Sequence, residues 1–324
     1  MSLSIYHGNE EWILKGFGVD LARAFSRKFP NIHVERYESF ISSPGSTKFH
    51  LFVQQGQLSQ FVSKSGEHLL SSTICIFTHF DIKQFPCKIL NKCLAVLFMS
   101  SSQLSVAVAN GLDSSKAMVC PIGVDQNIHN IYDQSSMSQL LNGSPVLQKM
   151  SSRTAVGFVT RYWGKPAYVR RKRYKLIIKV ADILSQMGIN VIILGPGWKD
   201  CKDALNKNNV VYVNTPYKNY PIIYNLMRVY CSLSLHEGGP VPLLESMSCG
   251  VRPVVTNTGF ASDVLKGHLD AHVLPINEDI HNIIGKILDA HASYLDSKFY
   301  RSIASSYTFD KVTEKVASLM GMVI

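Results

Sequence analysis

The sequence lacks the features of a secreted or membrane-spanning protein. Its first residues, MSLSIYHGNEE, become polar at once, without the apolar stretch of a secretory signal. The longest apolar runs, such as CLAVLFM and NVIILG, are too short to cross a bilayer. The seven cysteines stand singly and form no C-x-x-C pair, which fits a reducing compartment without a metal site. We therefore expect a cytoplasmic protein that binds no metal ion.

Acidic residues are also scarce relative to basic ones. The chain holds 33 Lys and Arg against 23 Asp and Glu, which gives a formal net charge of +10. Such an excess is typical of a well-solvated surface, or of a protein with an anionic partner such as nucleic acid, a nucleotide or an acidic membrane. Composition does not separate these interpretations. With 324 residues, 46% of them hydrophobic, the chain is long enough for two domains with a core each.

Short apolar runs alternate with helical patterns along most of the chain. Strand patterns stand at 3–7, 33–37, 48–54, 74–80, 95–101, 118–125, 154–160, 190–197, 209–215, 229–235 and 251–257. Helical patterns stand at 12–25, 57–70, 174–188, 220–229, 243–249 and 308–320. Before the alternation restarts at residue 154, the chain is rich in Ser, Asn and Gln and has little periodicity.

This alternation predicts an α/β protein with two Rossmann-like doubly wound domains facing a cleft. We predict a first domain at 1–135, a linker at 136–153, a second domain at 154–305 and a closing helix at 306–324. Ligands of such sheets bind beyond the carboxyl ends of the strands. A site shared by two facing domains would therefore lie in the cleft.

The stretch HEGGPVPLLESMSCG at 236–250 carries the clearest chemical pattern. Glu237 and Glu245 are eight positions apart, and Glu237 stands where the strand pattern ends. Gly238 and Gly239 allow a sharp turn and a close approach of the backbone to a ligand. Carboxylates repel phosphate but accept hydrogen bonds from hydroxyl groups. The pair predicts a ligand with polyhydroxyl groups on both sides of a phosphate, as in a sugar nucleotide.

The helix that follows this turn is expected to favour the same ligand. Pro242 suits the first position of a helix, and Gly250 suits its end. We expect the free N–H groups of the first turn to point at the ligand as an anion site. The helix dipole alone would contribute roughly 0.3–1 kcal/mol there.

At this point the sequence resembles the GT-B retaining glycosyltransferases of family 4, also described as glycosyl transferases group 1. The stretch CSLSLHEGGPVPLLESMSCGVRPVVTNTGFASDVL has their order of strand, Glu-x7-Glu, Cys-Gly and Pro-Val-Val, with Gly-Gly-Pro where Gly-Phe-Gly is usual. Further matching segments are AVGFVTRYWGKP, RRKRYKLIIKVADIL, NVIILGPGW, MVCPIGVDQNIH and SYTFDKVTEKV. The resemblance covers residues 117–324, and the first 116 residues carry few specific motifs.

The resemblance implies a role for each matching position. Arg161, after Thr160 in place of a glycine, would hold the donor diphosphate together with Lys172. Arg173 and Lys175 stand close by as alternatives to Lys172. Cations at these positions would stabilise the charge that develops on the leaving diphosphate. A solvent-facing basic run, some of it touching anionic lipid, is the plainer interpretation of the same residues.

The two glutamates take separate roles by the same analogy. Glu237 would bind hydroxyl groups of the transferred sugar near the reacting carbon, and Glu245 would bind the ribose hydroxyl groups. The backbone around Gly238, Gly239 and Pro240 would contact sugar or phosphate. The plainer interpretation is a pair of solvated acids at a helix start, where acids are favoured in any case.

Four further residues are weaker candidates. His79 ends a strand pattern of the first domain, where the family often places a histidine facing the reacting sugar, and a structural role is the alternative. Gly8 would touch the diphosphate, and Tyr217 would border the base or lie on a surface loop. His236 is expected to orient the loop rather than react.

The implied activity is transfer of a hexose-type sugar from a nucleotide-diphosphate sugar to an acceptor hydroxyl, with retention, without cofactor or metal. No Asp-x-Asp motif is present. The resemblance implies a glycan or lipid-linked acceptor in surface polysaccharide or glycolipid synthesis. An anionic membrane surface on the inner face of the membrane would be a further partner, and no nucleic acid is expected.

Three other interpretations compete with this one. A GT-B sugar-nucleotide epimerase would share the donor site, and a phosphorylase of the pyridoxal type would need a cofactor lysine that nothing here supports. A basic nucleic-acid-binding protein would use Tyr168 and Tyr174, within the basic run, as stacking platforms. A catalytically silent paralogue could act as a partner subunit, although the intact glutamate pair argues against it.

Overall fold

The computed structural model describes residues 1–7, 13–37, 47–53, 55–78, 87–141, 153–201, 209–268, 272–294 and 296–322. The chain divides into two compact units. The first comprises Met1–Asp125, Glu237–Val241 and Tyr307–Ile324, and the second comprises Gln126–His236 and Pro242–Ser306. The predicted domain limits at 135 and 154 stay predictions. Among the described residues, no helix combines the length and the apolar character needed to cross a bilayer.

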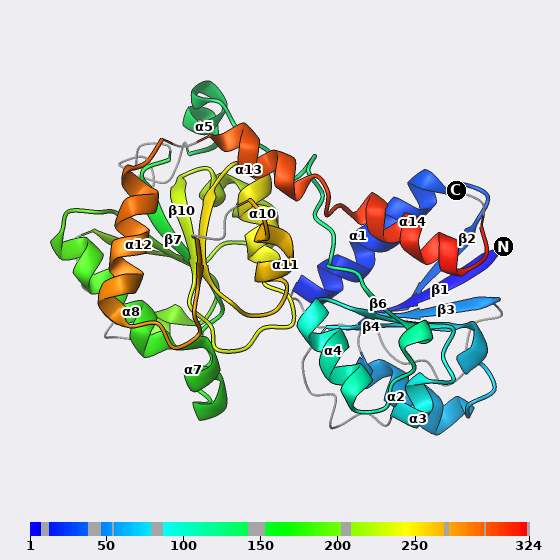
Figure 1. The fold of residues 1–324 in the computed structure, drawn as a ribbon. Helices are drawn as coiled ribbons and strands as arrows, with labels where there is room; N and C mark the ends of the chain where they lie inside the picture. The colour runs from blue at the N-terminus through cyan, green and yellow to red at the C-terminus, as the bar shows by residue number, and fades with distance from the viewer. Residues whose placement is uncertain are drawn as a thin grey trace. The chain divides into compact units, whose positions relative to one another are not determined.

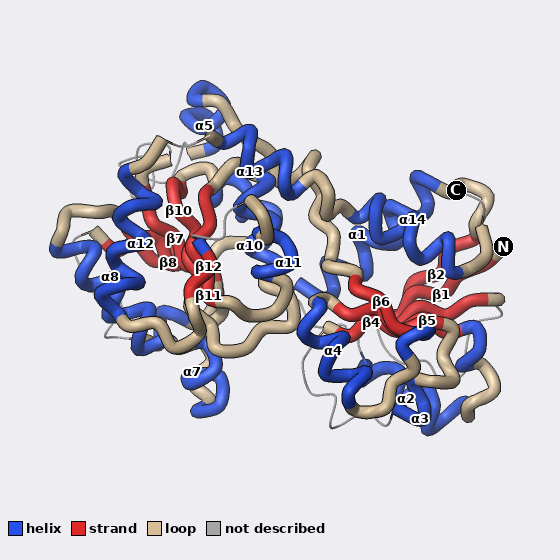
Figure 2. Tube along the Cα trace, viewed as in Figure 1, coloured by secondary structure: helices blue, strands red, loops and turns tan. Residues whose placement is uncertain are grey.

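The first unit is built around a parallel sheet of six strands (Figure 1). The strands are β1 (Ser2–Tyr6), β2 (His33–Tyr37), β3 (Phe49–Phe52), β4 (Thr73–Phe77), β5 (Ala95–Phe98) and β6 (Ala117–Val119), in the order β2-β1-β3-β4-β5-β6. The helices are α1 (Ile13–Lys28), α2 (Gln55–Ser65), α3 (Cys87–Leu90), α4 (Ser101–Ala109) and α14 (Phe309–Leu319), with 3₁₀ turns η1 (Leu70–Ser72) and η3 (Ser114–Lys116). Helices α1 and α14 cover one face of the sheet, and α2, α3 and α4 cover the other (Figure 2).

The second unit repeats this architecture with another parallel six-stranded sheet. The strands are β7 (Ala155–Val159), β8 (Val191–Leu194), β9 (Val210–Val213), β10 (Met227–Ser232), β11 (Arg252–Thr256) and β12 (Val273–Leu274), in the order β12-β11-β10-β7-β8-β9. The helices are α5 (Gln134–Leu140), α7 (Pro166–Lys172), α8 (Tyr174–Gln186), α9 (Tyr220–Tyr224), α10 (Val241–Ser248), α11 (Ala261–Leu265), α12 (Ile280–Ala292) and α13 (Ser297–Ala304). Two 3₁₀ turns, η4 (Trp198–Asp200) and η6 (Tyr217–Asn219), complete the unit.

The inner strands of both sheets are buried on both faces, which explains the apolar runs, whereas the edge strands β2 and β6 are only partly buried. The four residues of β8 and the five residues of β4 are all buried. Side chains of α8 and α12, including Ile177 and Ile287, pack with Phe158 of β7 in one core of the second unit. Parallel strands covered by helices on two faces need apolar residues at every position rather than in alternation. The expectation of two Rossmann-like doubly wound domains is confirmed.

Local patterns placed some element limits wrongly. The predicted helix at 220–229 ends at Tyr224, and Met227 begins strand β10, where it pairs with Ala155. Pairing inside the sheet outweighs the helical pattern of this segment. Helix α7 was not predicted. A single residue, Arg173 in the left-handed region (φ 52°), separates the end of α7 from the start of α8, so the two helices follow each other without a loop. The expected linker at 136–153 contains most of helix α5.

Candidate active site

The order of the strands in the second sheet brings two predicted site segments together. The chain starts in the middle of the sheet with β7, runs outward through β8 and β9, and returns on the other side with β10. Strands β7 and β10 are therefore neighbours, with Phe158 opposite Cys231. Their carboxyl ends form a topological switch point, the usual ligand position of an open α/β sheet. The loop with Arg161 follows β7, and the loop leading to Glu237 follows β10.

Aromatic side chains hold the loop after β7 by its backbone. The indole N–H of Trp198 donates to the carbonyl oxygen of Thr160 at 2.7 Å, and the hydroxyl of Tyr174 donates to that of Arg161. Both aromatic residues are buried. The guanidinium of Arg161, which is partly exposed, lies 4.5 Å from the ring centre of Trp163. Sequence reasoning identified Arg161, considered Tyr174 only as a stacking platform for nucleic acid, and missed Trp198; both aromatic residues hold this loop.

Two glycines allow the turn after β8 to pack against the same loop. Gly195 and Gly197 have φ angles of +137° and +89°, which L side chains rarely adopt. A β-carbon at Gly197 would lie 2.3 Å from the carbonyl oxygen of Tyr162, and one at Gly195 would lie 2.5 Å from that of Thr160. The Gly-Pro-Gly sequence is therefore required for the close approach of these two loops.

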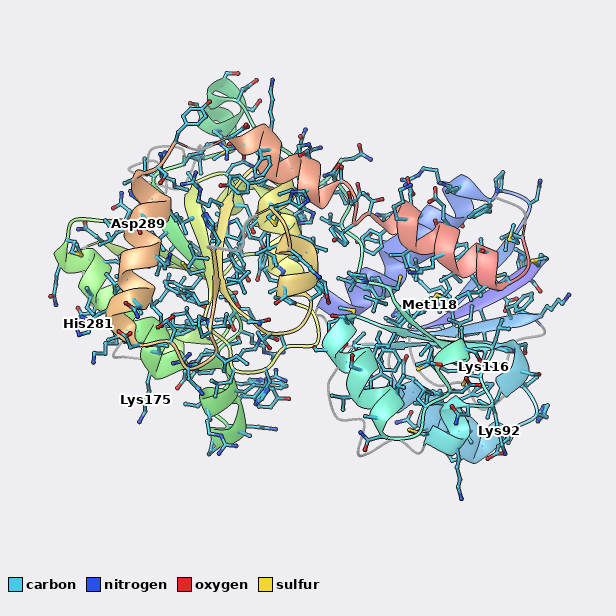
Figure 3. The ribbon with its side chains drawn as sticks, viewed as in Figure 1. Lys92, Lys116, Met118, Lys175, His281 and Asp289 are labelled. Atoms are coloured by element: carbon cyan, nitrogen blue, oxygen red, sulfur yellow. The ribbon has the colours of Figure 1, made fainter. Side chains whose placement is uncertain are left out.

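Helix α7 brings Lys172 beside the loop after β10. The backbone N–H of Leu235 donates to the carbonyl oxygen of Arg171 at 2.8 Å, which ties the end of α7 to the residue just before His236. The alternative cation Arg173 donates to the carbonyl oxygen of Ile276 at 2.8 Å. Lys175 is exposed and points away from its unit (Figure 3). Of the three candidate cations, Lys172 is therefore the one that we predict to bind the diphosphate, because the end of its helix is bonded to this loop.

The loop from β10 to α10 contains the first glutamate. Glu237 is half-buried and His236 is exposed. The hydroxyl of Thr256 on β11 donates to the carbonyl oxygen of Ser234 at 2.7 Å and fixes the start of this loop. Thr256 is fully buried and was not singled out by sequence reasoning.

The start of α10 is a poorer anion site than the sequence suggested. The N–H of Val241 donates to the carbonyl oxygen of Gly239 at 2.8 Å. Pro240 and Pro242, on either side of Val241, have no N–H group. Three of the residues at this helix start, Pro240, Val241 and Pro242, therefore have no free N–H group to offer a ligand. The turn therefore has fewer free donors than a helix start without prolines, and the anion site expected there stays a prediction.

The second glutamate lies in a buried polar cluster. The side chain of Glu245 on α10 is 1% exposed. One carboxylate oxygen accepts a hydrogen bond from the hydroxyl of Tyr217, and the other accepts one from Tyr224 at 2.6 Å. The Nε2 atom of His129 lies 3.9 Å from the first oxygen. A buried carboxylate is stable only when it is paired or hydrogen-bonded, so these neighbours explain how Glu245 can lie there.

The tyrosines remain neutral donors in this cluster. Burial, and then the charge of Glu245, raise the pKa of Tyr224 well above its usual value and that of Tyr220 to about 12. The same two causes raise the pKa of the Cys249 thiol. At neutral pH the phenol groups therefore keep their protons and donate to the carboxylate. Tyr217, which is 39% exposed, contacts Glu245 directly and so belongs to its surroundings.

Arg301 fixes the segment that carries His129. Its guanidinium donates to the carbonyl oxygens of His129 at 2.8 Å, Gln126 at 2.9 Å and Ser248 at 2.7 Å. The amide of Gln126 donates back to the carbonyl oxygen of Arg301 at 3.1 Å. These bonds attach the segment to the end of α10, next to Glu245. Sequence reasoning missed His129 and Arg301, since a single His or Arg outside a motif gives no signal.

In the second unit, the structure thus places Arg161 just after β7, Lys172 on α7, and Glu245 with Tyr217 in one polar cluster, whereas Glu237 groups with the first unit. Their roles stay predictions. His79 and Gly8 lie outside the described residues. Within the described part of the chain, no three His, Cys, Asp or Glu side chains come close enough together to hold a metal ion.

Comparison with known proteins agrees with this geometry. Residues 165–301 match the family model "Glycosyl transferases group 1". No curated protein sequence matches the chain. A solved structure of HepE from Anabaena in complex with UDP has 14% sequence identity and a TM-score of 0.73, with 99% of this chain and 100% of that chain covered.

Two other solved structures give the same result. Sucrose-phosphate synthase from Thermosynechococcus elongatus has 10% identity and a TM-score of 0.69, with 99% of this chain and 98% of that chain covered. The lipopolysaccharide outer core galactosyltransferase WaaB has 12% identity and a TM-score of 0.67, with 99% and 100% covered. At such identities the likeness establishes the fold. The chain therefore has the GT-B fold, and its residues 165–301 match the model of glycosyl transferases group 1.

Proposed function

We propose that the protein transfers a sugar from a nucleotide-diphosphate sugar to an acceptor hydroxyl with retention of configuration. One observation carries the proposal: Glu245, 1% exposed, lies within α10 (Val241–Ser248), the helix that follows the Glu237 loop. A buried carboxylate with tyrosine donors already in place is ready to accept hydrogen bonds from the hydroxyl groups of a ribose. HepE has been solved with UDP and with UDP-glucose, so a uridine donor is the first to test.

The remaining groups have distinct tasks in this reaction. Glu237 accepts hydrogen bonds from the transferred sugar and so orients its reacting carbon. Arg161 and Lys172 hold the diphosphate, and their charges stabilise it as the sugar–phosphate bond breaks and negative charge develops on the leaving oxygen. Because α10 offers few N–H donors, these two cations carry most of the diphosphate binding. Charge-assisted hydrogen bonds of this kind contribute roughly 1.5–3 kcal/mol each.

The donor is identified by thermal shift with UDP, GDP and ADP sugars. A true donor at a hundredfold excess over its Kd should stabilise the protein by about 2.7 kcal/mol. The variant Glu245→Gln should lose most of that stabilisation. The proposal fails if none of the nucleotide sugars shifts the unfolding transition of the wild-type protein.

Turnover of the identified donor then tests the chemistry. Glu237→Ala should abolish sugar transfer while the variant stays folded and still binds the free nucleotide diphosphate. Transfer should persist in EDTA, because the proposed reaction needs no metal ion. We propose a glycan or a lipid-linked glycan as the acceptor, in the synthesis of a surface polysaccharide or glycolipid. Unchanged turnover of Glu237→Ala would remove the role assigned to this residue.

A further inference from the structure

A strongly basic surface lies outside the residues assigned to sugar transfer. We call it the basic helix surface and define it by Trp163, Lys165, Tyr168, Arg170 and Arg171, on α7 and the loop before it. The surrounding segment 161–175 contains seven Lys and Arg and no Asp or Glu. It therefore supplies seven of the ten excess positive charges of the whole chain.

The cations of this surface are not balanced by neighbouring acids. Among the described residues, no carboxylate forms an ion pair with Lys165, Arg170 or Arg171. Other exposed cations of the chain do have such partners. Arg27, for example, lies 2.5 Å from Asp310. The Nε atom of Arg171 is buried without a hydrogen-bond partner. The surface thus concentrates positive charge that no carboxylate in the described part of the chain pairs with.

Aromatic rings alternate with these cations. The ammonium group of Lys165 lies 5.4 Å from the ring centre of Trp163, and the guanidinium of Arg171 lies 4.9 Å from that of Tyr168. The two rings meet edge to face with centres 4.6 Å apart. Cation–π contacts of this kind contribute roughly 0.5–1 kcal/mol each at exposed sites and favour these side-chain positions. The surface is therefore an ordered array rather than a set of independent side chains.

The arrangement fits a lipid headgroup region better than a nucleic acid. Bases bind by stacking on exposed ring faces, and here a cation lies over each of the two rings. Tyr174, the other expected platform, is 2% exposed. Trp and Tyr together with Lys and Arg are typical of segments that lie at a membrane surface. Helix α7 also protrudes from the rest of its unit (Figures 1 and 2).

We propose that the basic helix surface docks the protein on a membrane rich in anionic phospholipids. The cations bind headgroup phosphates, and the Trp and Tyr rings lie at the level of the headgroups. This inference goes beyond the proposed sugar transfer and does not depend on it, because Lys165 and Arg170 have no part in the donor site. A Lys or Arg near an anionic surface strengthens binding about fivefold.

The test is co-sedimentation with vesicles. Vesicles of phosphatidylglycerol and phosphatidylcholine in equal parts should bind the wild-type protein, and phosphatidylcholine vesicles should not. The double variant K165Q/R170Q should bind the anionic vesicles about 30-fold more weakly. The control K286Q/K298Q removes the same charge from two exposed lysines on α12 and α13 and should bind like the wild type. In about 1 M salt, where the Debye length is about 3 Å, binding should be lost.

Other outcomes would overturn the proposal. Equal binding by the two double variants would show that overall charge, not this surface, attracts the vesicles. Absence of binding to anionic vesicles would also overturn the proposal. Competition by a single-stranded oligonucleotide at lower phosphate concentrations than the vesicles would instead favour a nucleic-acid partner. Because K165Q/R170Q keeps the donor-site residues, its thermal shift with nucleotide sugars should match the wild type. A failure of vesicle binding is thereby separated from a failure of the donor site.

Discussion

At the scale of single residues, the second unit is organised around a buried carboxylate. Glu245 has two tyrosine donors and a histidine within 3.9 Å. A group of this kind is costly to bury and is stable only while its partners remain. The cluster therefore connects stability to the proposed donor site, since one carboxylate serves both.

Removing a single hydroxyl tests this connection. Tyr224→Phe should lower the free energy of unfolding of the second unit by about 1–3 kcal/mol, because one oxygen of Glu245 would stay buried without its donor. The matched control is Tyr294→Phe, where the side chain is 86% exposed, and it should change stability by less than about 0.5 kcal/mol. Urea unfolding measures both variants. Similar values for the two would contradict the assigned role of Tyr224.

A buried histidine of the first unit predicts a loss of stability in acid. His50 is 1% exposed, its Nδ1 atom lies 3.1 Å from the hydroxyl of Tyr6, and burial lowers its pKa to about 4. The unfolded chain binds the proton with a pKa of about 6.5, so the unfolded state gains protons first as pH falls. The stabilisation is complete above pH 6.5 and should be lost, by up to about 3 kcal/mol, as the pH falls to about 4.

Unfolding experiments across this pH range test the role of His50. His50→Gln should flatten the dependence between pH 6.5 and 4, because the titrating group is gone. His281→Gln, which changes an exposed histidine of α12, should leave the dependence as it is in the wild type. A wild-type dependence that survives in His50→Gln would assign the acid sensitivity to another group.

At the scale of elements, turns decide where the functional side chains lie. The loop after β7 and the turn after β8 approach so closely that two of the turn's residues must be glycine. The first of these loops carries Arg161, whose backbone is fixed by Tyr174 and Trp198. The proposed diphosphate site therefore depends on a turn that makes no contact with the ligand in the proposal.

Substitution in that turn should damage both stability and binding. Gly197→Ala combines a φ of +89° with a β-carbon 2.3 Å from the carbonyl oxygen of Tyr162. Gly188→Ala has a similar φ of +77° but open space around it, so its cost should be the conformational strain of roughly 1–2 kcal/mol alone. We expect Gly197→Ala to be clearly less stable and to lose the thermal shift given by nucleotide diphosphates. Equal behaviour of the two variants would exclude the steric explanation.

At the scale of the whole molecule, the two units are not continuous in sequence. The chain returns to the first unit after residue 306, where α14 packs beside α1. The rings of Phe17 and Phe309 are 5.6 Å apart, and Lys315 donates to the carbonyl oxygen of Val119 at 2.5 Å. Helix α14 thereby contributes to the packing of the first unit, although it follows the second unit in the sequence.

Removal of one aromatic ring from α14 tests this dependence. Phe309 is 8% exposed, and Phe309→Ala should destabilise the first unit by about 3–5 kcal/mol. Hydrogen exchange of the amides in β1 to β3 reports on this unit separately from the second. Phe299→Ala on α13, where the ring is 37% exposed, is the matched control and should leave that exchange unchanged. Faster exchange confined to the second unit in Phe309→Ala would refute the assignment.

The sequence by itself determined the class of the fold and pointed to the glutamate pair, and the resemblance to a family pointed to Arg161. Apolar runs separated by helical patterns require parallel sheets covered on both faces, and the Glu-x7-Glu stretch is local in sequence. Short-range features of this kind depend on backbone propensity and on neighbouring residues, so they can be read without coordinates. The resemblance added roles that the residues alone did not give.

Only the tertiary structure decided which other residues surround these groups. Tyr224 and His129 meet Glu245 from two separate segments, and Arg301 binds the carbonyl oxygen of Ser248 at the end of the same helix. The structure also showed that Val241 donates to Gly239, which leaves α10 with few free N–H groups. The physical reason is that burial and hydrogen bonding are satisfied by partners far apart in the chain, and packing of the complete fold selects those partners.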